Sequence, residues 1–176
     1  NKRMEAVLSD LKTQISDSSD DSDSSSPFDI FDDSRSMDSE IDDPDKDIVL
    51  DGNSYIGLIS FPTLGQEFPV TRGWSYAAMN TAACQYSGRR VDNDLIICAH
   101  NYTGFFDKLD KLNSGDEVIF TDVYGREFNY TVTNSELLSG WDSPSLIKGG
   151  GSDWDLTLFT CTWSGYSRVT VRLVYS

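Results

Sequence analysis

The sequence predicts a mainly β fold, a closed β-barrel of about eight strands with short helices and an N-terminal helical and acidic appendage. From residue 48 to residue 176, short apolar or alternating segments recur between turn residues, as short β-strands do. No segment repeats with a period of roughly 20–50 residues, which argues against a solenoid or a propeller. Seven or eight short strands with few helices therefore indicate a closed or nearly closed barrel.

Residues 1–47 are expected to form the appendage and residues 48–176 the barrel. Residues 2–15 carry apolar side chains at helical spacing, which predicts an amphipathic helix able to dock on the barrel. This apolar stripe consists of Met4, Val7, Leu8, Leu11 and Ile15. Residues 16–26 are acidic, Ser-rich and of low complexity, so we expect a linker there. Residues 27–31 form an apolar island within the acidic stretch.

The barrel elements follow in order along the chain. We expect strands at residues 55–61, 67–71, 95–99, 117–122, 127–134, 155–161 and 167–175. Residues 95–99 are a continuous apolar run, as in a buried strand, and a Gly-containing turn joins the fourth and fifth strands as a hairpin. The Ala-rich residues 74–84 and residues 105–112 are expected to be helical, and residues 139–153 a long loop.

The charge distribution excludes two classes of partner. The formal net charge is -15, and residues 1–47 hold 15 Asp and Glu against 5 Lys and Arg. We find no basic stripe of the kind that binds nucleic acid, and an anionic membrane surface would repel the chain. No apolar run is long enough to span a bilayer, and no signal peptide is recognisable.

The three cysteines, Cys84, Cys98 and Cys161, suggest a reactive thiol more than a metal site. There is no CxxC motif and only one His, so a zinc site is not expected, and neither is any other metal or cofactor. Cys84 and Cys98 lie in segments expected to be buried, where Cys packs as a small apolar residue. A Cys84–Cys98 disulfide remains an open alternative, and the odd count leaves at least one thiol over.

Three residues at strand ends could together perform acyl transfer. His100 ends one apolar strand, Cys161 ends another, and Arg168 begins the strand that follows. A thiol with an ordinary pKa of about 8.5 needs a base or a nearby cation to react at neutral pH. Acyl transfer also needs a proton donor for the leaving amine and a donor to the oxyanion. Arg172 faces the same side as Arg168 but lies deeper, so we interpret Arg172 as structural.

These segments resemble the sortase family. Residues 157–161 match the sortase TLxTC motif, an Arg follows on the next strand, and residues 95–101 look like the strand that ends in the catalytic His. The resemblance covers roughly residues 54–176 and implies a sortase-type barrel and a cysteine transpeptidase. The pair His100-Asn101 looks more like class B than class A or C, whereas the ending resembles class C. The connection between Cys161 and Arg168 is short, and the long helical insertion typical of class B is absent or reduced to residues 139–153, so we expect a compact class B-like enzyme.

The resemblance also implies roles, partners and a location. Cys161 would attack an LPxTG-like sorting motif, His100 would transfer protons, and Arg168 would bind the oxyanion. The partners would be surface proteins with a C-terminal sorting signal and an amine of peptidoglycan or of a pilin. The enzyme would lie on the outer face of the membrane of a Gram-positive bacterium, held by an anchor outside this sequence. Substrate contacts are expected at Leu158, Thr160, Asn101, Trp163 and Tyr166.

Several alternatives stay open at this point. The barrel could be a catalytically silent binding or scaffold module, or a cysteine peptidase that only hydrolyses. Residues 27–47 could form a lid over the active site, as in pilin sortases, or an extended spacer. We expect Tyr102 and the neighbouring Phe105-Phe106 to lie in the core rather than at the site. Trp163 and Tyr166 could pack locally instead of lining a groove.

Overall fold

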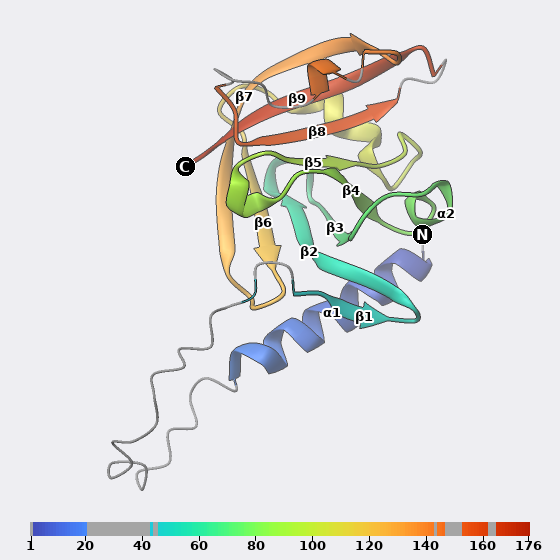
Figure 1. The fold of residues 1–176 in the computed structure, drawn as a ribbon, viewed down its shortest axis with the longest axis vertical. Helices are drawn as coiled ribbons and strands as arrows, with labels where there is room; N and C mark the ends of the chain where they lie inside the picture. Colours follow the sequence, from blue (N-terminus) through green and yellow to red (C-terminus); the bar gives the residue numbers. More distant parts are fainter. Residues whose placement is uncertain (1, 21–42, 44–45, 143, 147–152, 162–164) are drawn as a thin grey trace, which may run out of the picture.

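The computed structural model describes residues 2–20, 43, 46–142, 144–146, 153–161 and 165–176 (Figure 1). Its strands are β1 Ile48–Leu50, β2 Asn53–Phe61, β3 Gln66–Thr71, β4 Ala83–Ser87, β5 Leu95–Cys98, β6 Glu117–Asp122, β7 Glu127–Ser139, β8 Leu156–Cys161 and β9 Ser167–Tyr175. Its helices are α1 Lys2–Asp20, α2 Tyr76–Met79 and the 3₁₀ turns η2 Pro62–Leu64, η3 Arg90–Asp92, η4 Phe106–Lys111 and η5 Pro144–Leu146. No helix in these described ranges is both long and apolar enough to cross a membrane.

Eight of the described strands close into a barrel, as the sequence predicts. Their order is β2-β3-β4-β5-β8-β9-β7-β6, and β6 pairs again with β2. The closure depends on Gly57, which lies at a bulge in β2 and opposite Asp122 of β6. A Cβ atom at Gly57 would lie 2.1 Å from the backbone oxygen of Thr121, so only glycine lets the two strands meet. The short β1 extends β2 outside the ring.

The barrel interior is an apolar core that includes an aromatic trio. Phe61, Phe68 and Phe106 pack edge to face, with ring centroids 5.5–6.0 Å apart. Outside the barrel wall, a second cluster joins Phe159 of β8 to Met79 and Leu146. Both faces of β8 are therefore buried, which fixes its side chains on either side of the sheet.

Helix α1 docks on the barrel through the predicted apolar stripe. Met4, Val7, Leu11 and Ile15 are all buried, and the last three join a cluster that contains Tyr55 and Leu58. Lys12 adds an ion pair to Glu67 of β3. Figure 1 shows α1 running beside β1, across one end of the barrel. The helix continues to Asp20, into residues expected as linker, because extending a formed helix costs little once its nucleus is docked.

Three elements differ from the sequence prediction. Residues 74–84 were expected to be one helix, but α2 covers only Tyr76–Met79 and a strand, β4, begins at Ala83. The small residues of β4 permit either structure, and its pairing with β3 and β5 decides for the strand. The helix expected at 105–112 is the 3₁₀ turn η4. Strand β7 runs past residue 134 to Ser139, because β9 pairs with it along that length.

Candidate active site

The strand register brings the three predicted catalytic residues to one rim of the barrel. Strands β5, β8 and β9 are neighbours, and the parallel β5–β8 pairing joins residues 61 apart, as in Cys98 and Phe159. The amide of Ala99 continues this ladder by donating to the Phe159 oxygen at 3.4 Å. The same offset makes His100 level with Cys161, whose partner on β9 is Arg168. Neighbouring strands lie about 4.8 Å apart, so these positions are within reach of one substrate.

His100 sits in a partly buried aromatic setting. Its ring stacks on Tyr102 with centroids 4.5 Å apart, and the Phe105 ring lies edge-on at 6.5 Å. Burial lowers the pKa of His100 below its ordinary value, because an imidazolium loses hydration there. The imidazole is therefore neutral at pH 7 and can accept a proton.

Tyr102 was expected in the core, and that expectation is wrong. It is 51% exposed, while Phe105 and Phe106 are buried as expected. The chain leaves β5 at Cys98, and the amide of Phe106 turns back to bond the carbonyl of His100 at 2.9 Å. This turn leaves Tyr102 outside, against the imidazole. The sequence did hold a signal for this contact, because Tyr102 is an aromatic residue two positions after a His at the end of a strand.

Arg168 offers hydrogen-bond donors that the described residues leave unused. Its Nε and Nη1 atoms are buried and have no hydrogen-bond partner among the described residues. The guanidinium carbon lies 5.2 Å from the centroid of the Phe159 ring, on the outer side of the barrel wall. A guanidinium held in this way can donate to a carbonyl or oxyanion that arrives with a substrate.

Arg172, on the same strand and side, has the structural contacts expected of it. Its Nη1 donates to the carbonyl of Leu146 at 3.1 Å and to Thr157 Oγ1 at 2.8 Å, and Nη2 donates to the carbonyl of Ser145. Glu136 lies 3.7 Å from Nη2. With only 1% of its surface exposed, Arg172 fixes η5 to the barrel wall.

The predicted substrate contacts fall into different environments. Thr160 is 3% exposed, and its Oγ1 has no hydrogen-bond partner among the described residues. Leu158 lies wholly in the core, so its side chain packs there and has no surface for a substrate. Asn101 is half-buried beside a pocket, and Tyr166 is exposed. Trp163 lies outside the described residues, and so does the expected lid or spacer at 27–47 apart from residues 43, 46 and 47.

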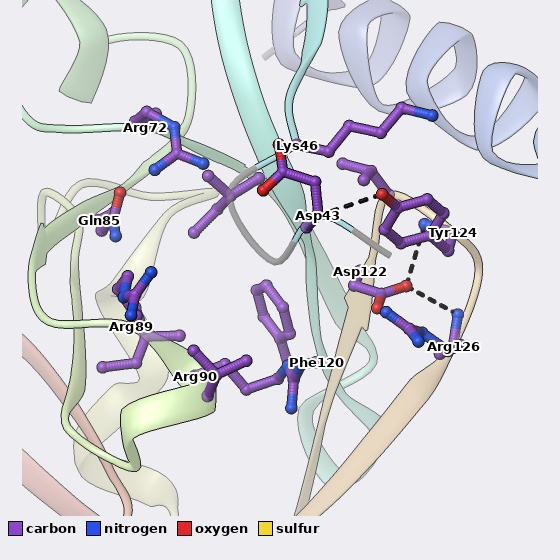
Figure 2. Close-up of a pocket in the computed structure, with 14 residues that line it drawn as sticks. Asp43, Lys46, Arg72, Gln85, Arg89, Arg90, Phe120, Asp122, Tyr124 and Arg126 are labelled. Atoms are coloured by element: carbon purple, nitrogen blue, oxygen red, sulfur yellow. Dashed lines mark hydrogen bonds and ion pairs between the residues drawn. The ribbon is translucent and has the colours of Figure 1, made fainter. Parts of the chain in front are cut away.

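A pocket at the other end of the barrel contains none of the predicted site residues (Figure 2). It lies near Leu95, where β5 begins, whereas the candidate site follows the last residue of β5. Asp122 organises its wall by accepting hydrogen bonds from the amides of Tyr124 and Arg126 at 3.0 and 2.9 Å. The lining arginine Arg72 pairs with Asp47, so this pocket holds structural ion pairs.

The remaining thiols are packing residues. Cys84 and Cys98 are buried, face each other across β4 and β5, and are not joined by a disulfide. Burial raises the pKa of the Cys84 thiol, which keeps it protonated and unreactive. Within the part of the chain that the structure describes, no three His, Cys, Asp or Glu residues gather closely enough to hold a metal ion.

Comparison with known proteins points to one family. The family model described as the sortase domain matches residues 59–176. Sortase A from Corynebacterium diphtheriae is 24% identical, with 70% of this chain and 61% of that chain covered and a TM-score of 0.63. Sortase C-3 from Streptococcus pneumoniae is 23% identical, with 77% and 65% covered and a TM-score of 0.63. A pilus-related sortase C of Group B Streptococcus is 25% identical, with 69% and 67% covered and a TM-score of 0.60.

The similar structures differ from this chain in length, and they carry the names of two sortase classes. The chain spans 61% of the length of the Corynebacterium sortase. A comparison with curated proteins gives no significant match. The three structures carry class A and class C names, and the class B-like subclass suggested by the sequence stays a prediction.

Proposed function

This chain belongs to the sortase family, whose members are cysteine transpeptidases, and on that premise we propose the following reaction for it. The enzyme cleaves an LPxTG-like sorting motif near the C-terminus of a surface protein and transfers the new acyl group to an amine. The amine belongs to peptidoglycan or to a pilin. The reaction takes place at the envelope of a Gram-positive bacterium, on the outer face of the membrane.

In the first half of the reaction, Cys161 is the nucleophile and His100 the base. The neutral imidazole takes the proton of the thiol as sulfur attacks the scissile carbonyl, which agrees with the lowered pKa of His100. Arg168 donates Nε–H and Nη1–H to the oxyanion of the tetrahedral intermediate. The imidazolium then protonates the leaving nitrogen, the C–N bond breaks, and a thioester remains on Cys161.

In the second half, the acceptor amine resolves the thioester. The imidazole of His100 removes a proton from the attacking amine, a C–N bond forms, and the C–S bond breaks. The proton returns from His100 to the sulfur of Cys161, so the enzyme ends in its starting state. Arg168 binds the oxyanion again.

One observation supports the proposal: Cys161 pairs with Arg168 across β8 and β9, His100 follows the end of the neighbouring β5, and two buried guanidinium donors have no partner among the described residues. A silent scaffold has no need to bury donors without partners, because each unpaired buried polar group costs about 1–3 kcal/mol. Such a cost is expected where a substrate supplies the missing acceptor.

The test uses the full chain, a panel of sorting-motif peptides and two amines, triglycine and a lysine derivative. Mass spectrometry should detect an acyl-enzyme on Cys161 and a new amide product. Cys161→Ala should lose both while circular dichroism shows an unchanged fold. Formation of the free acid alone, with every amine, would favour a hydrolytic peptidase. An untouched peptide panel, together with no labelling of Cys161 by a thiosulfonate, would favour a silent barrel.

A further inference from the structure

A pocket of about 350 Å³ lies directly behind the candidate catalytic residues. Its wall includes Asn101, Thr160 and Val169, each the immediate chain neighbour of one of those residues. The rest of the lining that matters here is Phe106, Asp107 and Asp110 from η4. The volume is within the range of pockets that bind small organic groups.

The pocket opens on the side of the barrel wall opposite to Arg168. Side chains alternate between the faces of a strand, so the paired residues Thr160 and Val169 share a face with Leu158, in the barrel interior. Arg168 lies on the other face, over Phe159. A peptide donor bound by Arg168 and an occupant of the pocket would therefore approach the end of β8 from opposite sides.

Two carboxylates give the pocket its charge. In the 3₁₀ turn η4, residues three apart eclipse each other, so Asp107 and Asp110 share one face. Phe106 and Leu109, at 2% and 1% exposure, share the adjacent face of the turn and fix it in the core. Gln66 Nε2 donates to Asp107 Oδ1 at 3.2 Å and helps to hold this carboxylate in place.

Among the described residues, the lining of the pocket contains no Lys or Arg. Asp110 has an ion pair with Lys111, whose Nζ lies 3.8 Å from Oδ2 on a side chain that is 70% exposed. Such an exposed pair contributes little energy and leaves both carboxylates able to bind another cation.

Thr160 provides an independent sign that the pocket takes a ligand. It lines the pocket, it is 97% buried, and its Oγ1 has no hydrogen-bond partner among the described residues. A buried hydroxyl without a partner is costly in a folded protein. An N–H group that entered the pocket would remove that cost by donating to Oγ1.

We propose that this acceptor pocket, formed by Asn101, Asp107, Asp110 and Thr160, binds the amine substrate as a primary alkylammonium on a flexible side chain. The carboxylates bind the cation, and Phe106 and Val169 bound the space for its methylenes. A terminal glycine amine has no such methylene chain to fill this space. The inference rests on the proposed transpeptidation and adds the class of its second substrate.

The chemistry of the transfer requires two protons to leave the ammonium. One passes to the neutral imidazole of His100, which makes the nitrogen nucleophilic, and the imidazolium releases this proton to solvent. The C–N bond to the thioester carbon then forms and the C–S bond breaks. The second proton goes to the departing sulfur, and the amide product keeps one N–H.

The test compares the full wild-type chain with Asp107→Asn/Asp110→Asn and with the control Asp10→Asn/Glu127→Gln, so both variants lose two negative charges. Asp10 is exposed on α1 and Glu127 is exposed at the start of β7, and neither lines the pocket. The acceptor is Nα-acetyl-lysine amide, and the ratio of amide to free acid is measured from one donor peptide. The double variant should raise the KM for the amine about three- to tenfold, and the control should not change it.

Two further measurements separate this inference from the proposed function. Thr160→Val should also raise the KM for the lysine derivative, whereas the rate with triglycine should depend less on these side chains. Independently of turnover, n-butylammonium should shift the amide resonances of residues 101–110 in wild type and not in the double variant. An inactive enzyme that still binds n-butylammonium would overturn the peptide chemistry alone. Equal KM values and no shift would overturn the acceptor pocket.

Discussion

Arg168 and Arg172, both on β9, differ in the hydrogen-bond acceptors that surround their guanidinium groups. Arg168 and Arg172 share a strand and a face, but Arg172 donates to acceptors in η5 and β8, whereas Nε and Nη1 of Arg168 have no partner among the residues that the structure describes. Sequence spacing could place both on one side of the strand. It could not show which guanidinium would have acceptors, because the carbonyls of Leu146 and Ser145 lie 26 and 27 residues away in the sequence.

Substitution should separate these roles. Arg168→Ala should lower kcat/KM for donor cleavage about 10²- to 10³-fold, because oxyanion stabilisation is lost, with little change in Tm. Arg172→Ala should instead lower the free energy of unfolding by about 3 kcal/mol, since it leaves buried carbonyls without donors. Peptide kinetics and urea denaturation of both variants measure the two effects. A large loss of stability in Arg168→Ala would contradict the assignment.

His100 is the only histidine of the chain, so its titration can be followed directly. Burial lowers its pKa, and an NMR titration of its single imidazole should give a value below 6.5. As the pH falls, His100 is protonated in the unfolded chain before it is protonated in the folded chain. The free energy of unfolding therefore falls as the pH drops from about 6.5 through the folded-state pKa. His100→Asn should remove this part of the pH dependence. A titration midpoint above 6.5 would contradict the buried, neutral imidazole.

At the scale of elements, periodicity succeeded where one face of a segment is buried. The stripe of α1 and the alternation of β6 and β9 were read from apolar spacing alone. Strand β4 and the outer half of β7 were missed, because small or polar residues carry no such signal there. Their structure comes from pairing with β5 and β9, which are distant in sequence.

The docking of α1 can be tested at its most buried residue. Leu11 is fully buried among the residues under α1, so Leu11→Ala should lower the free energy of unfolding by about 2–4 kcal/mol. Asp10→Ala, at an exposed position of the same helix, should change it by less than about 0.5 kcal/mol. Thermal and urea denaturation provide the measurement. Equal stability of the two variants would show that α1 contributes nothing to the folded barrel.

At the scale of the whole molecule, the sequence predicted the closed barrel, which the structure confirms, but not the pockets. The catalytic roles of the three site residues stay predictions. The TLxTC segment and the His100 strand end mark the site locally. The acceptor pocket depends on how η4 turns back under the end of β8, which brings Asp107 near Thr160 across more than 50 residues. No local pattern encodes that distance.

The whole fold also sorts the three cysteines by reactivity. Cys84 and Cys98 are 0% and 1% exposed, so the native chain should react with a thiol reagent once, at the proposed nucleophile Cys161. In denaturant, three thiols should react. Counting with Ellman's reagent under both conditions, and in Cys161→Ala, checks this expectation. A single reactive thiol in denaturant would mean that Cys84 and Cys98 had become oxidised to a disulfide.

The position of β9 has a consequence for how the protein matures. This strand enters between β7 and β8, both of which precede it in the chain, and it brings Arg168 with it. During synthesis, the ring therefore stays open and the guanidinium is missing until nearly all of the sequence has emerged. A nascent chain would hold the proposed nucleophile Cys161 without the proposed oxyanion donor Arg168, and the proposed activity would begin only after the barrel had closed.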